Sequence, residues 1–212
     1  TKIEGGMGLL MGGTAGVQAA HVVIVGAGTV GLSAAKVAMG MGARVTILDS
    51  NLFRLRQIDD LFGGRIQTLA SNAFNIAAAV KDADLLVGSV LIPGALTPKL
   101  VTEAMVKTMK KGAAIVDVAI DQGGCIEVTA KHGATYHDNP TFMFEGIVCY
   151  SVGNMPGAVA RTSTFTLTNA TMPYMVALAN KGWKKACQDD KALARGINTY
   201  DGKVYFKGVS DA

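Results

Sequence analysis

The residues with the clearest chemical pattern are three glycines in the segment Gly26-Ala27-Gly28-Thr29-Val30-Gly31. In this spacing the first glycine permits a tight turn, the second lets the backbone approach a pyrophosphate, and the third allows a helix to pack closely on a strand. The helix that opens at Thr29 and Val30 would present free N–H groups and a partial positive charge to phosphate. The pattern predicts a dinucleotide site, with a glycine turn that holds no ligand as the alternative.

Two charged side chains follow this segment. Asp49 ends the next predicted strand, and an acid at that place can accept hydrogen bonds from the ribose hydroxyls of an adenosine. Its carboxylate would also repel a 2′-phosphate, so we expect NAD as the cofactor rather than NADP. Arg54 either lies along the cofactor or caps the helix that comes next.

A further acidic residue, Asp121, ends the predicted strand 113–120 and precedes a Gln-Gly-Gly segment at 122–124. Ligands of open parallel sheets bind outside the carboxyl ends of the strands, so this carboxylate suits a role beside the nicotinamide. The alternative is that Asp121 caps the next turn through its side chain. Asp117 lies in the middle of the same predicted strand, and we expect it to be a structural partner.

Histidines and cysteines form weaker patterns. His21 starts a strand, whereas His132 and His137 fall in a predicted loop, where a solvated turn is favoured over a metal site. The three cysteines are far apart and form no Cys-x-x-Cys pair, so we expect neither a disulfide nor zinc. This cysteine usage is typical of a cytoplasmic protein.

Alternating strands and helices must position these residues. Continuous apolar runs that end near glycine predict buried strands, and segments of helix-forming composition separate them. We expect strands at 21–25, 44–49, 65–70, 84–90 and 113–120, and helices at 31–42, 52–64, 73–83 and 98–112. This alternation predicts an α/β fold, a doubly wound parallel sheet of the Rossmann type with helices on both faces.

The pattern changes in the second half of the chain. It loosens over 121–142, before a predicted strand at 147–155. A helix is expected over 163–188, with Pro173 as its kink or its start. An Asp-Gly turn predicts a hairpin within 198–206. We therefore expect a glycine-rich lead-in at 1–20, a dinucleotide-binding domain at 21–155, and a separate C-terminal helix-and-hairpin segment at 156–212.

Composition excludes several classes of protein. Half of the 212 residues are hydrophobic and 17% are charged, which rules out a disordered chain. No apolar run approaches the roughly 18 residues of a membrane span, so we expect none. The net charge of +4 is small and the lysines are scattered, whereas nucleic-acid binders concentrate their cations on one stripe. We expect no nucleic-acid partner.

Four long segments give the sequence a family resemblance. Residues 9–31, 45–65, 91–124 and 154–183 strongly resemble L-alanine dehydrogenase, and the similarity runs nearly the whole length of the chain. The resemblance implies NAD-dependent, reversible oxidative deamination of L-alanine to pyruvate and ammonia. It also implies a separate substrate domain, to which the C-terminal segment returns, and a homo-hexamer in the intact family.

The resemblance assigns roles to individual residues. It implies that Asp49 is the ribose-binding acid, that Ser71 contacts the adenosine side, and that Asp121 is the catalytic aspartate near the nicotinamide. It further implies contacts with the backbone and apolar wall around the cofactor at Val90 and Leu91, and with the nicotinamide side at Asn154 and Met155.

The resemblance is incomplete in one respect. The family's catalytic His, and the Arg and Lys that hold the substrate carboxylate, match nothing in this chain. We therefore expect the chain to be the cofactor-binding part of a longer protein and to be inactive alone. The alternative is a non-catalytic NAD-binding module or a transhydrogenase-like subunit. That subunit tends to read Glu-Arg-Gly-Gly where residues 121–124 read Asp-Gln-Gly-Gly, which favours alanine dehydrogenase.

Overall fold

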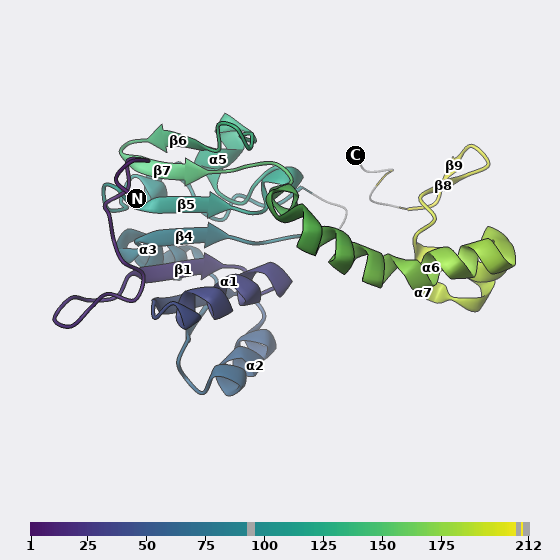
Figure 1. Cartoon of the computed structure of the whole chain (residues 1–212), viewed down its shortest axis with the longest axis horizontal. Coiled ribbons are helices and arrows are strands. Elements are labelled where there is room, and N and C mark those ends of the chain that lie inside the picture. Colours follow the sequence, from purple (N-terminus) through teal and green to yellow (C-terminus); the bar gives the residue numbers. More distant parts are fainter. Residues whose placement is uncertain (93–95, 207–208, 210–212) are drawn as a thin grey trace. The chain divides into compact units, whose positions relative to one another are not determined.

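The computed structural model describes residues 1–92, 96–206 and 209, and it divides into two compact units (Figure 1). The first unit comprises residues 1–92 and 96–153, and the second begins at Asn154.

The first unit is built on a seven-stranded sheet with the order β3-β2-β1-β4-β5-β7-β6 (Figure 1). All neighbouring strands are parallel except β6, which runs antiparallel to β7 at the edge. The strands are β1 His21–Val25, β2 Arg44–Asp49, β3 Gln67–Ala70, β4 Leu85–Gly88, β5 Ala114–Asp117, β6 Thr141–Phe144 and β7 Ile147–Tyr150. The predicted doubly wound parallel sheet is confirmed.

The first strand shows why its sequence is an unbroken apolar run. Val22 and Ile24 of β1 belong to the hydrophobic core on one face of the sheet, and Val23 and Val25 belong to the core on the other. Successive side chains of a strand point to opposite faces, so a strand covered on both sides must be apolar throughout. β1 accordingly lies inside the sheet, between β2 and β4.

Five helices cover the two faces of the sheet. They are α1 Thr29–Gly40, α2 Leu52–Phe62, α3 Ala73–Asp82, α4 Glu103–Val106 and α5 Glu127–His132. Buried side chains of α1 and α2 pack in one core, and those of α3, α4 and α5 pack in the other. Gly63 ends α2 in the left-handed conformation, as expected of a glycine at a helix end.

The expected helix over 98–112 is wrong, because only the four residues of α4 are helical. The backbone before α4 pairs elsewhere: the N–H groups of Leu100 and Val101 donate to the carbonyl of Cys125 at 2.9 and 3.3 Å. Thr102 then caps α4 through its side chain, which accepts a hydrogen bond from the N–H of Met105. Pairing with a distant segment therefore overrides the helix-forming composition.

The segment 121–142 is more ordered than its loose pattern suggests. It contains α5, the first two residues of β6, and most of a 3-10 helix, η1, at Ile120–Gln122. The strand expected over 113–120 ends earlier, at Asp117, and the strand expected over 147–155 ends at Tyr150. Asp121 consequently lies in η1 rather than at the end of a strand.

The segment 1–20 lies within the first unit. Met7 donates its N–H to the carbonyl of Gly112 at 2.9 Å, and Ala20 donates to the carbonyl of Met11 at 2.9 Å. The lead-in therefore lies near the amino end of β5, which begins just after Gly112.

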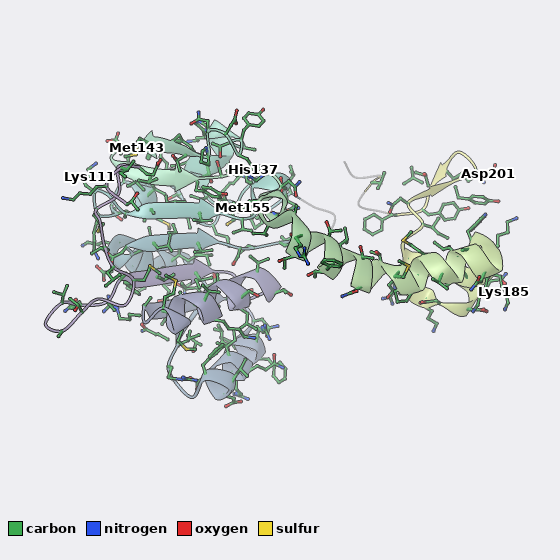
Figure 2. All side chains as sticks on the ribbon, viewed as in Figure 1. Lys111, His137, Met143, Met155, Lys185 and Asp201 are labelled. Atoms are coloured by element: carbon green, nitrogen blue, oxygen red, sulfur yellow. The ribbon has the colours of Figure 1, made fainter. Side chains whose placement is uncertain are left out.

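The second unit contains η2 Met155–Val159, α6 Ala160–Asp189, α7 Lys191–Arg195, β8 Thr199–Tyr200 and β9 Lys203–Val204. Pro173 lies inside α6, so it is not the start of the helix. The non-helical residue is Gly182, whose φ of 68° only glycine adopts without strain. The predicted hairpin is confirmed, with Asp201 in its turn (Figure 2). The turn residues Asp201 and Gly202 both have positive φ. In the described part of the chain, no helix is long and apolar enough to cross a membrane.

Candidate functional site

A cleft of about 630 Å³ opens at the carboxyl ends of β1, β2 and β4. β1 lies between β2 and β4, so the strand order reverses here, and open α/β sheets bind ligands at such a switch point. Eight residues predicted for cofactor binding line it: Gly26, Gly28, Thr29, Val30, Asp49, Ser71, Val90 and Leu91. The other lining residues are Ser50, Ser89, Ile92, Pro98 and Leu100.

Two glycines of the predicted motif are required by close packing. A Cβ on Gly31 would lie 1.9 Å from the carbonyl oxygen of Gly26, so α1 can approach the turn only with glycine at this position. Gly26 has a φ of +102°, and a Cβ there would lie 2.7 Å from the carbonyl oxygen of Ser89. These two positions bring the turn after β1 against the end of β4.

The middle glycine has a different environment. A Cβ on Gly28 would meet no protein atom within 4 Å, and Gly28 lines the cleft. Gly28 is also the N-cap residue of α1, and it has no side chain with which to cap the helix. The first turn of α1 contains no acidic residue. Open space in front of a helix N-terminus without a side-chain cap suits a bound phosphate group.

Asp49 forms the rim of the cleft at the end of β2. One carboxylate oxygen accepts a hydrogen bond from the N–H of Ala27 at 2.8 Å, and the other accepts from the N–H of Asn51 at 2.8 Å. These two bonds fix the carboxylate beside the glycine turn. An ionised carboxylate has about four acceptor positions, so it can accept further hydrogen bonds from hydroxyl groups.

Arg54 lies behind the glycine turn and does not line the cleft in this structure. Its Nε donates to the carbonyl of Ala27 at 2.8 Å, and its guanidinium also donates to Gln57 at 3.3 Å. The cap of α2 is Asn51, whose side chain accepts from the N–H of Arg54. The expectation that Arg54 caps this helix is therefore wrong, because Asn51 occupies the N-cap position.

Sequence reasoning missed Ser89, which lies in the cleft wall directly after β4. Its buried hydroxyl is 2.9 Å from the carbonyl oxygen of Gly26 and 3.1 Å from that of Val25. The hydroxyl thus ties the end of β4 to the end of β1 on both sides of the switch point. The only sequence signal was a hydroxyl residue at the end of an apolar strand.

Asp121 is exposed and lies in η1, outside the lining of the cleft. A Cβ added to Gly153 would be 3.4 Å from one of its carboxylate oxygens, so the side chain lies beside Gly153. Asn154 and Met155 belong to the second unit, where Asn154 has a left-handed backbone conformation and precedes η2.

Asp117 is a fully buried structural partner, as predicted. Its carboxylate accepts hydrogen bonds from the N–H groups of Cys125 and Ile126, both at 3.1 Å, and from the hydroxyl of Thr129 at 2.5 Å. Burial, with the Asp117 charge nearby, raises the pKa of the Cys125 thiol to about 12. This cysteine is therefore a protonated core residue.

The histidines lie away from the cleft. His21 is buried at the start of β1, and its Nε2 is 2.8 Å from the hydroxyl of Thr46 on β2. The prediction that His132 lies in a loop is wrong, because this residue ends α5. Its ring stacks on Phe142 with ring centroids 3.7 Å apart. His137 lies between α5 and β6 (Figure 2). The described residues contain no group of acids, histidines and cysteines that could hold a metal ion.

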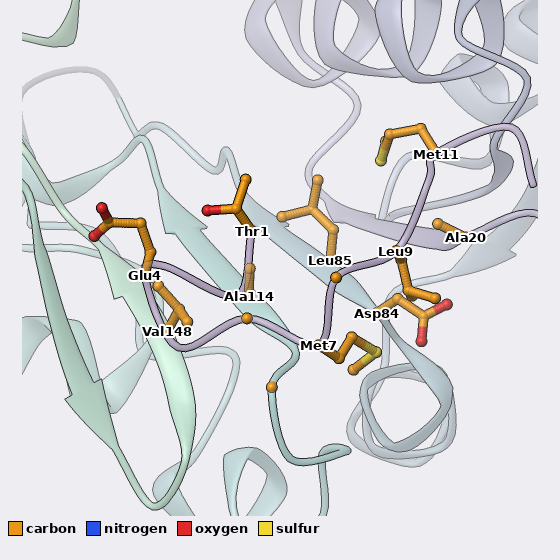
Figure 3. A pocket seen from close by; sticks show the side chains of 13 residues that line it. Thr1, Glu4, Met7, Leu9, Met11, Ala20, Asp84, Leu85, Ala114 and Val148 are labelled. Atoms are coloured by element: carbon orange, nitrogen blue, oxygen red, sulfur yellow. The ribbon is translucent and has the colours of Figure 1, made fainter.

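A smaller hollow of about 180 Å³ lies near the amino ends of β4 and β5 (Figure 3). The lead-in segment lines it with Met7, Leu9 and Met11, next to the strand beginnings at Leu85 and Ala114. It is separate from the glycine turn, because that turn lies at the carboxyl ends of the parallel strands and the hollow lies at their amino ends.

The strand order, the switch-point cleft and the glycine turn together define a nucleotide-binding domain of the Rossmann type. Comparison with known proteins specifies it further. The chain belongs to the alanine dehydrogenase/PNT C-terminal domain family, whose profile matches residues 1–207.

Several relatives support this assignment. An alanine dehydrogenase of Bilophila wadsworthia is 93% identical over 216 residues, covering 100% of this chain and 57% of that protein. An alanine dehydrogenase of Methanococcus maripaludis is 59% identical and is covered over 56% of its length. The chain thus spans little more than half the length of these relatives.

Solved structures give the same result. An L-alanine dehydrogenase matches 99% of this chain with a TM-score of 0.90 and 47% identity, and 57% of that chain is covered. A transhydrogenase from Sinorhizobium meliloti matches 72% of this chain with a TM-score of 0.63 and 28% identity, and 44% of that chain is covered.

Proposed function

We propose that this chain binds NAD(H) as the cofactor part of an enzyme that converts L-alanine and water to pyruvate and ammonia. The observation that carries the proposal is the open space in front of Gly28 at the N-terminus of α1, with the Asp49 carboxylate on the same rim. The identity of 93% to a protein named alanine dehydrogenase supports the substrate.

The cleft residues fit the parts of a dinucleotide. The N–H groups at the start of α1 would hold the pyrophosphate, and Gly28 gives it room to approach. Asp49 would accept hydrogen bonds from the adenosine ribose and disfavour a 2′-phosphate. The remaining proposed contacts are Ser71 on the adenosine side, Val90 and Leu91 along the wall, and Asn154 and Met155 on the nicotinamide side. Arg54 would support the turn from behind.

The reaction assigns a role to Asp121. Bound NAD supplies the acceptor for the hydride that leaves the Cα of L-alanine. The amine must then be replaced by an oxygen atom from water, with release of ammonia and one proton. We propose that the Asp121 carboxylate accepts and returns a proton during this exchange, as a general acid–base.

The organisation of the whole protein is part of the proposal. Residues 21–155 would form the cofactor domain, and 156–212 would return to a substrate domain that supplies the substrate carboxylate site. Exposed apolar side chains on α6, among them Phe165, Leu167 and Met175, support a homo-oligomer, a hexamer by family resemblance. The free thiols of the three cysteines support a cytoplasmic location.

The transhydrogenase-like alternative has weaker support. The match to the Sinorhizobium meliloti transhydrogenase has a lower TM-score and lower identity than the match to L-alanine dehydrogenase, 0.63 against 0.90 and 28% against 47%. No feature of the described residues favours that alternative over alanine dehydrogenase.

A segment exchange tests the proposal. The chain replaces the matching segment of the Bilophila wadsworthia alanine dehydrogenase, and L-alanine-dependent formation of NADH is measured. We expect this chimera to be active, its Asp121→Asn variant to lose most of the activity while still binding NADH, and the 212-residue chain alone to be inactive. An inactive but folded chimera, or turnover by the chain alone, would contradict the proposal.

A further inference from the structure

Two segments run side by side next to the cleft, 97–101 and 122–127. The N–H of Leu100 donates to the carbonyl of Cys125 at 2.9 Å, and a parallel β-bridge pairs the two segments one residue further on. Leu100 also lines the cleft. The cleft wall is therefore joined by backbone hydrogen bonds to the turn that follows Asp121.

Lys99 reinforces this junction through its side chain. Its ammonium nitrogen lies 2.5 Å from the carbonyl oxygen of Gly123 and 2.7 Å from that of Gly124. Both glycines have positive φ, +86° and +75°. Consecutive glycines are the most flexible pair in a chain, so a cation that bridges their carbonyl groups restricts them strongly.

The same turn is held from its inner side by Asp117. The buried carboxylate accepts the N–H groups of Cys125 and Ile126, and a Cβ on Gly124 would lie 2.7 Å from one of its oxygens. A cation thus binds carbonyl groups on the outside of the turn, and an anion binds N–H groups on the inside. Each charge faces the backbone dipoles of the opposite sign.

We propose that Lys99 is a positioning residue, which fixes the turn carrying Asp121 against the wall of the dinucleotide cleft by bridging the carbonyl groups of Gly123 and Gly124. The proposal rests on the proposed function, since that function gives Asp121 its role. Lys99 is exposed, and exposed charges contribute little to global stability. Its loss should therefore move or loosen the turn without unfolding the protein.

The first experiment measures the turn directly in this chain. Amide hydrogen exchange is followed for Lys99→Met, for the conservative Lys99→Arg and for Lys36→Met, a matched change of an exposed lysine on α1. We expect Lys99→Met to speed exchange over residues 122–126 by about tenfold, through local opening of the turn. Lys99→Arg should restore most of the protection, and Lys36→Met should change nothing there.

The second experiment measures catalysis in the chimera. Because a misplacement of about 1 Å can cost as much as about 100-fold in rate, we expect Lys99→Met to lower kcat by at least about tenfold. The KM for NAD should stay within about twofold, because Lys99 does not line the cleft, and Lys99→Arg should recover kcat.

The two proposals fail differently. Unchanged exchange, or an unchanged kcat in Lys99→Met beside an inactive Asp121→Asn chimera, would overturn the role of Lys99 alone. A fully active Asp121→Asn chimera would overturn the role of Asp121, and the positioning role with it.

Discussion

Two of the glycines in the turn after β1, Gly31 and Gly28, have different physical environments. Gly31 is fixed by packing, because a Cβ there would overlap the carbonyl of Gly26. Gly28 is fixed by nothing within the protein, because a Cβ there would enter open space. We propose that glycine at position 31 is needed for folding and glycine at position 28 for binding of the dinucleotide, so substitutions at the two positions should separate stability from binding.

Matched alanine substitutions test this separation. We expect Gly31→Ala to lower the free energy of unfolding by about 1–3 kcal/mol through overpacking. Gly28→Ala should leave it within about 0.5 kcal/mol but weaken NADH binding by about tenfold, or about 1.4 kcal/mol. Urea unfolding and fluorescence titration of both variants measure the two effects. A destabilised Gly28→Ala with normal NADH affinity would contradict the assignment.

Asp49 should decide between the two dinucleotides. Asp49→Ala should weaken NAD binding by about 1–3 kcal/mol, since ribose hydroxyls lose their acceptor, and should narrow the discrimination against NADP. Asp60→Ala removes an exposed acid of α2 and is the control, expected to bind NAD normally. Calorimetric titration gives all the affinities. If the unaltered chain bound NADP as tightly as NAD, the role of Asp49 would be wrong.

Among the helices and strands, those whose positions depend on local sequence signals could be predicted. The strands β1 and β2 and the helices α1 to α3 were foreseen, because buried apolar runs and terminal glycines are local signals. The helix expected over 98–112 failed because residues 100–101 pair with Cys125, more than twenty positions along the chain, and no periodicity records that partner. The same pairing explains why Lys99 gave no signal as a site residue.

The cleft shows the same division. Its glycine turn and Asp49 follow from spacing, whereas Ser71, Val90 and Leu91 came from family resemblance. Ser89 was missed because its contacts with Val25 and Gly26 exist only once β4 pairs with β1.

We expect the buried His21, which joins β1 to β2, to make the stability of the first unit depend on pH. Burial, followed by the charge of Arg44, lowers the pKa of His21 below its usual 6.5. The unfolded chain therefore takes up a proton that the folded chain resists, so the free energy of unfolding falls as pH drops below about 6.5. The free energy of unfolding is measured with urea at pH 7.5 and at pH 5.5. Between these two pH values it should change less in His21→Gln than in the unaltered chain.

His137→Gln removes an exposed histidine and provides the control, expected to keep the full pH dependence. Equal pH dependence in the unaltered chain and in His21→Gln would show that His21 does not cause it.

At the scale of the whole molecule, the two units differ in how they bury apolar surface. The first has hydrophobic cores on both faces of its sheet, whereas α6 of the second exposes most of its large apolar side chains. Phe165 and Leu167, for example, are 60% and 65% exposed. We infer from this exposed apolar surface that another chain or domain binds to α6.

We therefore expect the isolated chain to associate. Light scattering at micromolar concentration should show species larger than a monomer, and Phe165→Glu with Leu167→Glu should reduce them. Ile3→Glu changes an exposed apolar residue outside α6 and should leave association unchanged. A single monodisperse monomer peak from the unaltered chain would count against this expectation.

We propose that a complete dinucleotide site lies within these 212 residues, whereas turnover of L-alanine needs residues outside them. The direct test is a titration of the chain alone with NADH. Binding is monitored by calorimetry and by the increase in nicotinamide fluorescence. We expect saturable binding of one NADH per chain, weaker binding of NADPH, and no L-alanine-dependent NADH formation in the same sample. A correctly folded chain that shows no saturable NADH binding would contradict the proposed dinucleotide site.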